Sequence, residues 1–171
     1  MVVSPSLPAK TVPEFIAYAK ANPGRVNMTS SGAGNLSHLA GELFKAMTGI
    51  EVVHVPYKGA VLAHAGLMAG EVHVMFDAMT SALPNIRSGR LRALAVTTAT
   101  RSEALADIPT VAEAVPGFAV SSWLGIGAPV GTPGEIVDKL NMEINAVLAD
   151  PAIKARFAAL SSEPLVVSPA D

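Results

Sequence analysis

The chain has 171 residues, of which half are apolar, 15% are charged and none is cysteine, and its formal net charge is −2. This composition excludes a disordered chain, disulfide bonds, thiol chemistry and cysteine-ligated zinc. No cluster of Lys and Arg stands out, which argues against a nucleic-acid partner, and no apolar run approaches the about 20 residues of a membrane-spanning helix. The length suits one domain with a core, or one domain plus part of another.

Helices and strands alternate in the first part of the sequence. We predict helices from Thr11 to about Ala21, from the glycine-rich turn at 32–34 to Gly49, over 60–69, and over 80–88 with an interruption at Pro84. We predict strands at 25–28, 52–55, 72–76 and 91–96, of which the strand at 52–55 is fully buried. This order favours an α/β fold with a mostly parallel sheet and helices on its faces.

The pattern changes after residue 109. We predict extended segments at 118–122 and 124–128, a helix from the capping box at 132–135 to Ala149, a helix from Asp150, and a strand at 165–167. Residues 168–171 resemble the start of a helix, and residues 1–3 resemble the end of a strand. We therefore expect a chain that is cut at both ends of a larger lobe; the alternative is a short natural protein with frayed termini.

Polar residues gather where three predicted strands end, in the junctions 29–37, 56–59 and 77–81. Their side chains include those of Ser30, Ser31, Asn35, Ser37, Lys58, Thr80 and Ser81. If the strands are parallel, the junctions share one edge of the sheet, where ligands of open α/β sheets bind. Helix N-termini and hydroxyl groups favour an anion there. Asp77 is the exception, and it would orient donors or meet an amino group of the ligand.

The glycine-rich turn does not match a nucleotide-binding pattern. Ser37 stands where the third glycine of G-x-G-x-x-G belongs, and neither a P-loop nor a G-x-S-x-G motif is present. A catalytic triad would need His54 or His73 near Asp77, because Ser37 and the adjacent His38 point in different directions. The four histidines lack metal-ligand spacing, so we expect no metal and no other cofactor. A tight turn without any ligand would explain the glycines equally well.

Five segments in order resemble the tripartite tricarboxylate transporter substrate-binding proteins, the Bug or TctC family. They are "SSGAGNLSHLAGELFKAMTG" (30–49), "VVHVPYKG" (52–59), "VMFDAMTSALPNIRSGRLRALAVT" (74–97), "IPTVAEAVPGF" (108–118) and "GAPVGTPGEIVDKLN" (127–141). The resemblance covers nearly the whole chain. It implies a type II-like periplasmic binding protein fold with two α/β lobes around a Venus-flytrap cleft.

The resemblance also implies a function. Family members are periplasmic receptors that capture small organic acids or acidic amino acids, deliver them to membrane transporter subunits and catalyse no reaction. The ligand-binding positions of the family match Ser31, Gly32, Ala33, Gly34, Asn35, Ser37, Tyr57, Lys58, Gly59 and Asp77 of this sequence. A carboxylate held by N–H groups and hydroxyls at a helix N-terminus is the ligand that we expect.

Several features depart from the family pattern. The usual signal peptide and the first-lobe "PGGGxD"-like loop are absent from the sequence, and residues 61–70, with His64, differ from the usual run. We expect residues 5–118 to form the second lobe and residues 119–171, with 1–4, to be a fragment of the first. Because this fragment would expose the apolar stripe of the helix at 133–149, we expect a homodimer, with exchange of residues 119–171 as one route. The alternatives are the ligand-sensing effector domain of a LysR-type regulator, or an enzyme of the hydrolase or dehydrogenase type.

Overall fold

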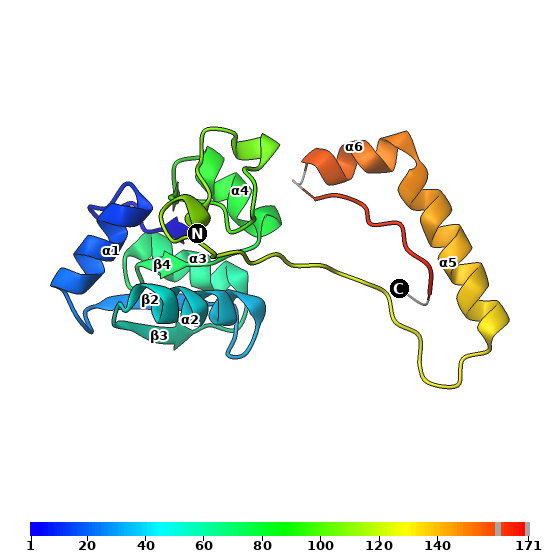
Figure 1. Cartoon of the computed structure of the whole chain (residues 1–171), viewed down its shortest axis with the longest axis horizontal. Helices are drawn as coiled ribbons and strands as arrows, with labels where there is room; N and C mark the ends of the chain where they lie inside the picture. Colours follow the sequence, from blue (N-terminus) through cyan, green and yellow to red (C-terminus); the bar gives the residue numbers. More distant parts are fainter. Residues whose placement is uncertain (160–161, 170–171) are drawn as a thin grey trace. The chain divides into compact units, whose positions relative to one another are not determined.

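The computed structural model describes residues 1–159 and 162–169 (Figure 1). The chain divides into two compact units, Met1–Ser122 and Trp123–Asp171, and each is described by itself. None of the helices in the described residues combines the length and the apolar character needed to cross a lipid bilayer.

The first unit contains a five-stranded mixed sheet with the strand order β3-β2-β4-β1-β5. The strands are β1 (Val2–Val3), β2 (Val26–Ser30), β3 (Val52–Pro56), β4 (Val74–Met75) and β5 (Arg92–Ala93). β2 is parallel to both β3 and β4, whereas β1 is antiparallel to β4 and β5. The α/β class and the parallel core of the sheet agree with the sequence prediction, but half of the strand pairs are antiparallel.

Helices of the first unit begin and end at the predicted signals. They are α1 (Val12–Ala21), α2 (Leu36–Thr48), α3 (Ala60–Ala69) and α4 (Met79–Arg87), with short 3-10 helices η1 (Glu103–Leu105) and η2 (Val111–Glu113). Thr11 caps α1 by accepting a hydrogen bond from the N–H of Glu14. Gly49 ends α2 in a left-handed conformation with φ 67°, which glycine adopts without a steric cost. The predicted break at Pro84 is wrong: α4 continues through it, anchored by the buried Ala82 and Leu83.

Helices cover both faces of the sheet. One apolar cluster joins α1, α2 and the even-numbered strand residues Val26, Met28 and Val74; the ring of Phe44 on α2 lies at its centre, 5.3 Å from that of Phe76. The other cluster joins Met75 of β4 to residues of α3 and α4. The alternation of side chains along each strand therefore supplies two cores.

Two predictions about the first unit need correction. β3 is not fully buried, because it is the edge strand of the sheet and Val53 is 47% exposed. Residues 1–4 do not accompany residues 119–171: Val2 pairs with Met75 and with Ala93 inside the sheet of the first unit. The cause is long-range pairing, which the local sequence of residues 1–4 does not encode.

The second unit consists of α5 (Gly134–Ala149), α6 (Pro151–Ala159) and extended segments. The predicted capping box of α5 is wrong, because Pro133 is the N-cap and the Thr132 hydroxyl donates to the carbonyl of Pro129 instead. The predicted strand at 165–167 is also not formed; the carbonyl of Val167 accepts hydrogen bonds from the side chains of Asn141 and Asn145. Of the predicted helix start at 168–171, residues 170 and 171 lie outside the described residues.

Candidate functional site

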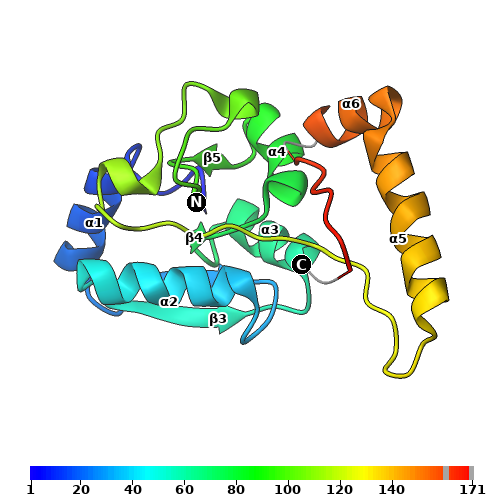
Figure 2. The ribbon, with the colours of Figure 1, turned by 45° about the vertical axis from the view of Figure 1, so that its right-hand side comes forward.

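The three predicted junctions meet at one edge of the sheet, beyond the carboxyl ends of the parallel strands β3, β2 and β4 (Figure 2). The carbonyl of Ser30 accepts from the N–H of Tyr57 at 3.0 Å, and the carbonyl of Ser31 accepts from the N–H of Gly59 at 3.0 Å. On the other side of β2, the last paired residues are Thr29 and Met75. Asp77 comes two residues after Met75, as Ser31 comes two residues after Thr29, so the two residues follow the sheet at equivalent positions.

Three helices start at this edge, since α2 follows β2, α3 follows β3 and α4 follows β4. None of the three carries an acidic residue in its first turn. In the described part of the chain, the amide N–H groups of Leu36 and Ser37 have no hydrogen-bond partner, as is usual for the first turn of a helix. The edge thus presents free N–H groups and the positive ends of three helix dipoles, which is an environment that attracts an anion.

The turn before α2 is held by three polar side chains. The Asn35 side chain caps α2 by accepting from the N–H of His38 at 3.1 Å, and its amide donates to the hydroxyl of Ser31 at 2.7 Å. The hydroxyl of Ser37 donates to Asn35 at 2.8 Å and accepts from the N–H of Ser31 at 3.1 Å. Gly34 has φ 80°, so a residue with a side chain would be strained there.

The segment 57–59 lines the edge mainly with its backbone. The Tyr57 hydroxyl is directed away, because it donates to the Glu71 carboxylate at 3.3 Å and lies against the backbone of Gly66. Burial, together with the adjacent Glu71 carboxylate, raises the pKa of Tyr57, so the phenol stays protonated. Lys58 is exposed, and within the described residues its amine has no ion-pair partner. It is therefore free to approach an anion at the edge.

Asp77 belongs to a buried hydrogen-bonded cluster. Its Oδ2 atom lies 2.6 Å from Nε2 of His64 and accepts from the hydroxyl of Ser81 at 2.8 Å; Nδ1 of His64 is 3.1 Å from the side-chain amide of Asn85. The side chains of His64 and Asp77 are only 7% and 4% exposed. The partner of Asp77 is thus His64 on α3, not the His54 or His73 that a triad would require. These three residues do not form a triad, because Ser81 donates to the carboxylate and not to the imidazole.

Sequence reasoning missed the pairing of His64 with Asp77, although one signal was available. His64 stands in the apolar run 61–70, where a buried imidazole needs a polar partner. Asp77 is the acidic residue at the end of the strand that follows α3, so it was the natural candidate.

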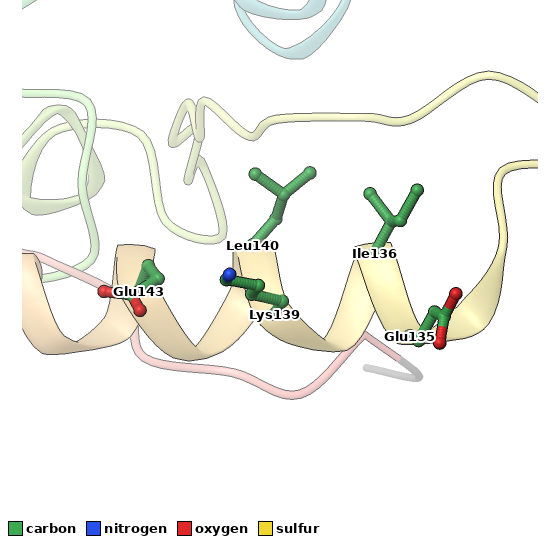
Figure 3. Close-up of a pocket in the computed structure, with 5 residues that line it drawn as sticks. All are labelled: Glu135, Ile136, Lys139, Leu140 and Glu143. Carbon is green, nitrogen blue, oxygen red and sulfur yellow. The ribbon is translucent and has the colours of Figure 1, made fainter.

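Each of the two units has a surface depression, and neither depression is lined by a predicted site residue. One is lined on α5 by Glu135, Ile136, Lys139, Leu140 and Glu143. Figure 3 shows the side chains of Ile136 and Leu140 projecting next to each other, with the charged residues along the flank. The other is lined by Thr11, Val12, Pro13, Pro109, Thr110, Glu113 and Ala114. Among the described residues, no group of three His, Cys, Asp or Glu side chains could hold a metal ion.

Comparisons with known proteins point in one direction. A family model described as "Tripartite tricarboxylate transporter family receptor" matches residues 1–171. A protein of Pseudomonas sp. (strain P51), described as a UPF0065 protein in the tcbD-tcbE intergenic region, is 42% identical over 146 residues, which are 84% of this chain and 44% of that protein.

Two solved structures from Rhodopseudomonas palustris have the same fold. Rpa4515 with adipate matches with a TM-score of 0.96 and 41% identity over 99% of this chain. MatC (Rpa3494) with bound malate matches with a TM-score of 0.88 and 30% identity over 99% of this chain. This chain covers 57% of each of the two structures. It therefore spans about half the length of these relatives.

Proposed function

The chain belongs to the family of tripartite tricarboxylate transporter receptors, and from this premise we propose that its three-junction edge is part of a binding site for a small organic acid. The family consists of solute-binding receptors, which are periplasmic and are not enzymes. Neither the enzyme nor the regulator alternative is supported by the comparisons.

One observation carries the proposal: three helix N-termini converge on this edge, with no acidic residue in any of their first turns. The free N–H groups of α2 and the hydroxyl of Ser31 can donate to a carboxylate, and Ser37, whose proton is bonded to Asn35, supports this turn. The exposed Lys58 adds a positive charge. The names of two similar structures, which mention adipate and malate, support a dicarboxylate as the ligand.

We assign the proposed contacts to the predicted residues, with different roles. Ser31, Asn35 and Ser37 supply polar side chains, whereas Gly32, Ala33, Gly34, Tyr57 and Gly59 shape the backbone of the edge. The N–H groups of Gly32, Gly34, Tyr57 and Gly59 already donate within it, and, within the described residues, that of Ala33 is left for a ligand. The carboxylate of Asp77 is hydrogen-bonded to His64 and Ser81, so its role is to support the edge. It would contact a ligand only if the ligand displaced one of these two partners. Asp77 would bind the ligand directly only if the ligand carries an amino group.

The wider role of the receptor is proposed on the same basis. We propose that the receptor delivers its acid to membrane transporter subunits from the periplasm. Because a single edge offers few contacts compared with a closed two-lobe cleft, this chain should bind its ligand weakly.

We also propose that copies of this chain form homodimers through α5. Within the second unit, neither α6 nor the segment 162–169 covers Ile136 and Leu140, which are 46% and 48% exposed. Exposed apolar faces of this kind favour association. Exchange of residues 119–171 between copies is one arrangement that would bury the face.

A thermal-shift screen tests the proposed ligand class. The wild-type chain is heated with mono-, di- and tricarboxylates and with acidic amino acids, each on the order of 10 mM so that weak binding still raises Tm. We expect a dicarboxylate to raise Tm and Ser37→Ala to reduce the rise. Glucose at the same concentration serves as the uncharged control. If no acid raises Tm above that control, the proposal is wrong.

A further inference from the structure

Two histidines that the predicted site does not include lie against its glycine-rich turn. His38 is in the first turn of α2, and His54 is in the middle of β3. Their rings stack, with centroids 3.9 Å apart and planes 15° from parallel. Each ring is also hydrogen-bonded to the turn at residues 30–34, so the pair joins the turn to both elements.

The hydrogen bonds fix the protonation of the ring atoms that face the turn. The backbone N–H of Gly34 donates to Nδ1 of His38 at 3.0 Å, and this bond requires an Nδ1 atom without a proton. The Ser30 hydroxyl donates its one proton to the carbonyl of Gly32 at 2.9 Å. The Nε2 atom of His54, 2.7 Å from the same hydroxyl oxygen, must therefore be the donor in that contact.

The charges around the stack come from α2. Nε2 of His38 lies 3.7 Å from the carboxylate of Glu42, which is itself paired with Lys45 at 2.9 Å. Burial lowers the pKa of His54, and the neighbouring His38 lowers it further. Two stacked rings repel each other when both are charged. The hydrogen bond from Gly34 is made by the uncharged form of the His38 ring, and burial favours the uncharged form of His54.

We propose that His38 is a positioning residue of the carboxylate site: its uncharged ring, stacked on His54, holds Gly34 and with it the turn 31–35. When Nδ1 of His38 takes up a proton, it becomes a donor that faces another donor, and the bond to Gly34 is lost. Acid then releases the turn that presents the free N–H groups of α2. The consequence for ligand binding rests on the proposed function; the consequence for the turn does not.

The test compares the wild-type chain with two variants of His38. In His38→Asn, the side-chain oxygen lies near the former position of Nδ1 and still accepts from Gly34, but it does not titrate. In His38→Gln, the amide reaches the former position of Nε2 and leaves Gly34 without an acceptor. The pair therefore separates loss of the hydrogen bond from loss of the ring.

The first readout is the backbone amide resonance of Gly34 in isotope-labelled protein, followed from about pH 8 to about pH 5, the range in which histidine titrates. We expect the resonance to move with the titration of the His38 ring in the wild type, to stay constant in His38→Asn, and to lie near its acid position at every pH in His38→Gln. A Gly34 resonance that ignores the titration, or that moves equally in His38→Asn, overturns the inference.

The second readout is the rise in Tm caused by adipate at about pH 7.5 and about pH 5.5. We expect the rise in Tm to shrink more at acid pH in the wild type than in His38→Asn. Because adipate is protonated equally in both samples, the comparison with His38→Asn corrects for protonation of adipate itself. His38→Gln should bind about five- to tenfold more weakly at neutral pH, as expected for one lost hydrogen bond. If adipate has no effect on any variant, the proposed function fails, while the Gly34 resonance still decides the role of His38.

Discussion

The Nε2 atom of His64 lies 2.6 Å from the Oδ2 atom of Asp77, and this buried contact joins α3 to the strand end where the candidate site begins. Ser81 donates to the same oxygen atom, so the carboxylate has one ring and one hydroxyl as partners. Burying a carboxylate costs free energy because it loses water, and its hydrogen-bond partners offset that cost. Loss of one partner should therefore lower the stability of the fold.

We expect His64→Leu to lower the free energy of unfolding by about 3 kcal/mol, because it leaves the Asp77 carboxylate buried with one partner fewer. His64→Gln keeps an N–H donor near the position of Nε2 and should cost about 1 kcal/mol. Urea unfolding of the two variants measures the difference. Adding Asp77→Asn to His64→Leu removes the buried charge and should recover part of the loss; equal stability of His64→Leu and wild type would contradict the prediction.

Variants of Asn35 separate the cap of α2 from the proposed site. Asn35→Ala removes the acceptor for the N–H of His38 and should cost about 1 kcal/mol of stability. Asn35→Asp keeps the cap, and the Ser31 hydroxyl can donate to the new carboxylate instead of accepting from the amide, so the variant should unfold like the wild type. Its carboxylate would repel an acidic ligand at the same edge. The measurement is Tm with and without adipate. If Asn35→Asp responds to adipate as strongly as the wild type, the ligand does not bind at this turn.

Stability should fall as the solution becomes more acidic than about pH 6.5. Burial lowers the pKa of both His54 and His73 in the folded chain. Below the ordinary histidine value, the unfolded chain therefore binds more protons than the folded chain, and acid favours unfolding. Unfolding in urea at a series of pH values gives the slope.

Two isosteric variants control the pH prediction. His54→Gln retains a donor for Ser30, and His73→Asn retains an acceptor for the N–H of Asn27, which donates to Nδ1 of His73 at 2.9 Å. Neither substitute titrates, so each should flatten the dependence of stability on pH. Slopes that equal the wild-type slope in both variants would exclude these two histidines as its source.

The apolar face of α5 should control self-association. The double variant Ile136→Lys and Leu140→Lys should convert a dimer to a monomer at micromolar concentration, because it places charge on the exposed apolar face. The matched control is Glu135→Gln with Glu143→Gln, which changes the net charge by the same amount on the flank of that face. Size exclusion with light scattering distinguishes the two results. A wild-type chain that is monomeric at this concentration would contradict the proposed homodimer.

Local signals predicted the helices well and the strands less well. The glycine-rich turn at 32–34 and the glycine at 49 located α2, because helix ends depend on residues that are close in sequence. The predicted strand at 72–76 is reduced to Val74–Met75, since its length depends on how many residues its neighbours in the sheet can pair. The apolar run 165–167 forms no strand because no partner strand lies beside it in the described structure.

The same distinction applies to the candidate site. The turn at 31–35 was predictable, because glycine and an N-cap asparagine before an apolar helix specify it locally. The contacts of His64 with Asp77 and of His38 with His54 were not, because each joins two elements whose distance is set by packing on the sheet. The sequence therefore located the polar edge but not the histidines that support it.

The position of β1 also affects how the chain folds as it is synthesised. β1 pairs with β4 and β5. The sheet can therefore be completed only after Arg92 and Ala93 of β5 have left the ribosome. Until then the edge of β1 that faces β5 is unpaired, and such edges bind other extended chains. A chaperone that covers this edge of β1 during translation would therefore protect the nascent chain more than one that acts after its release.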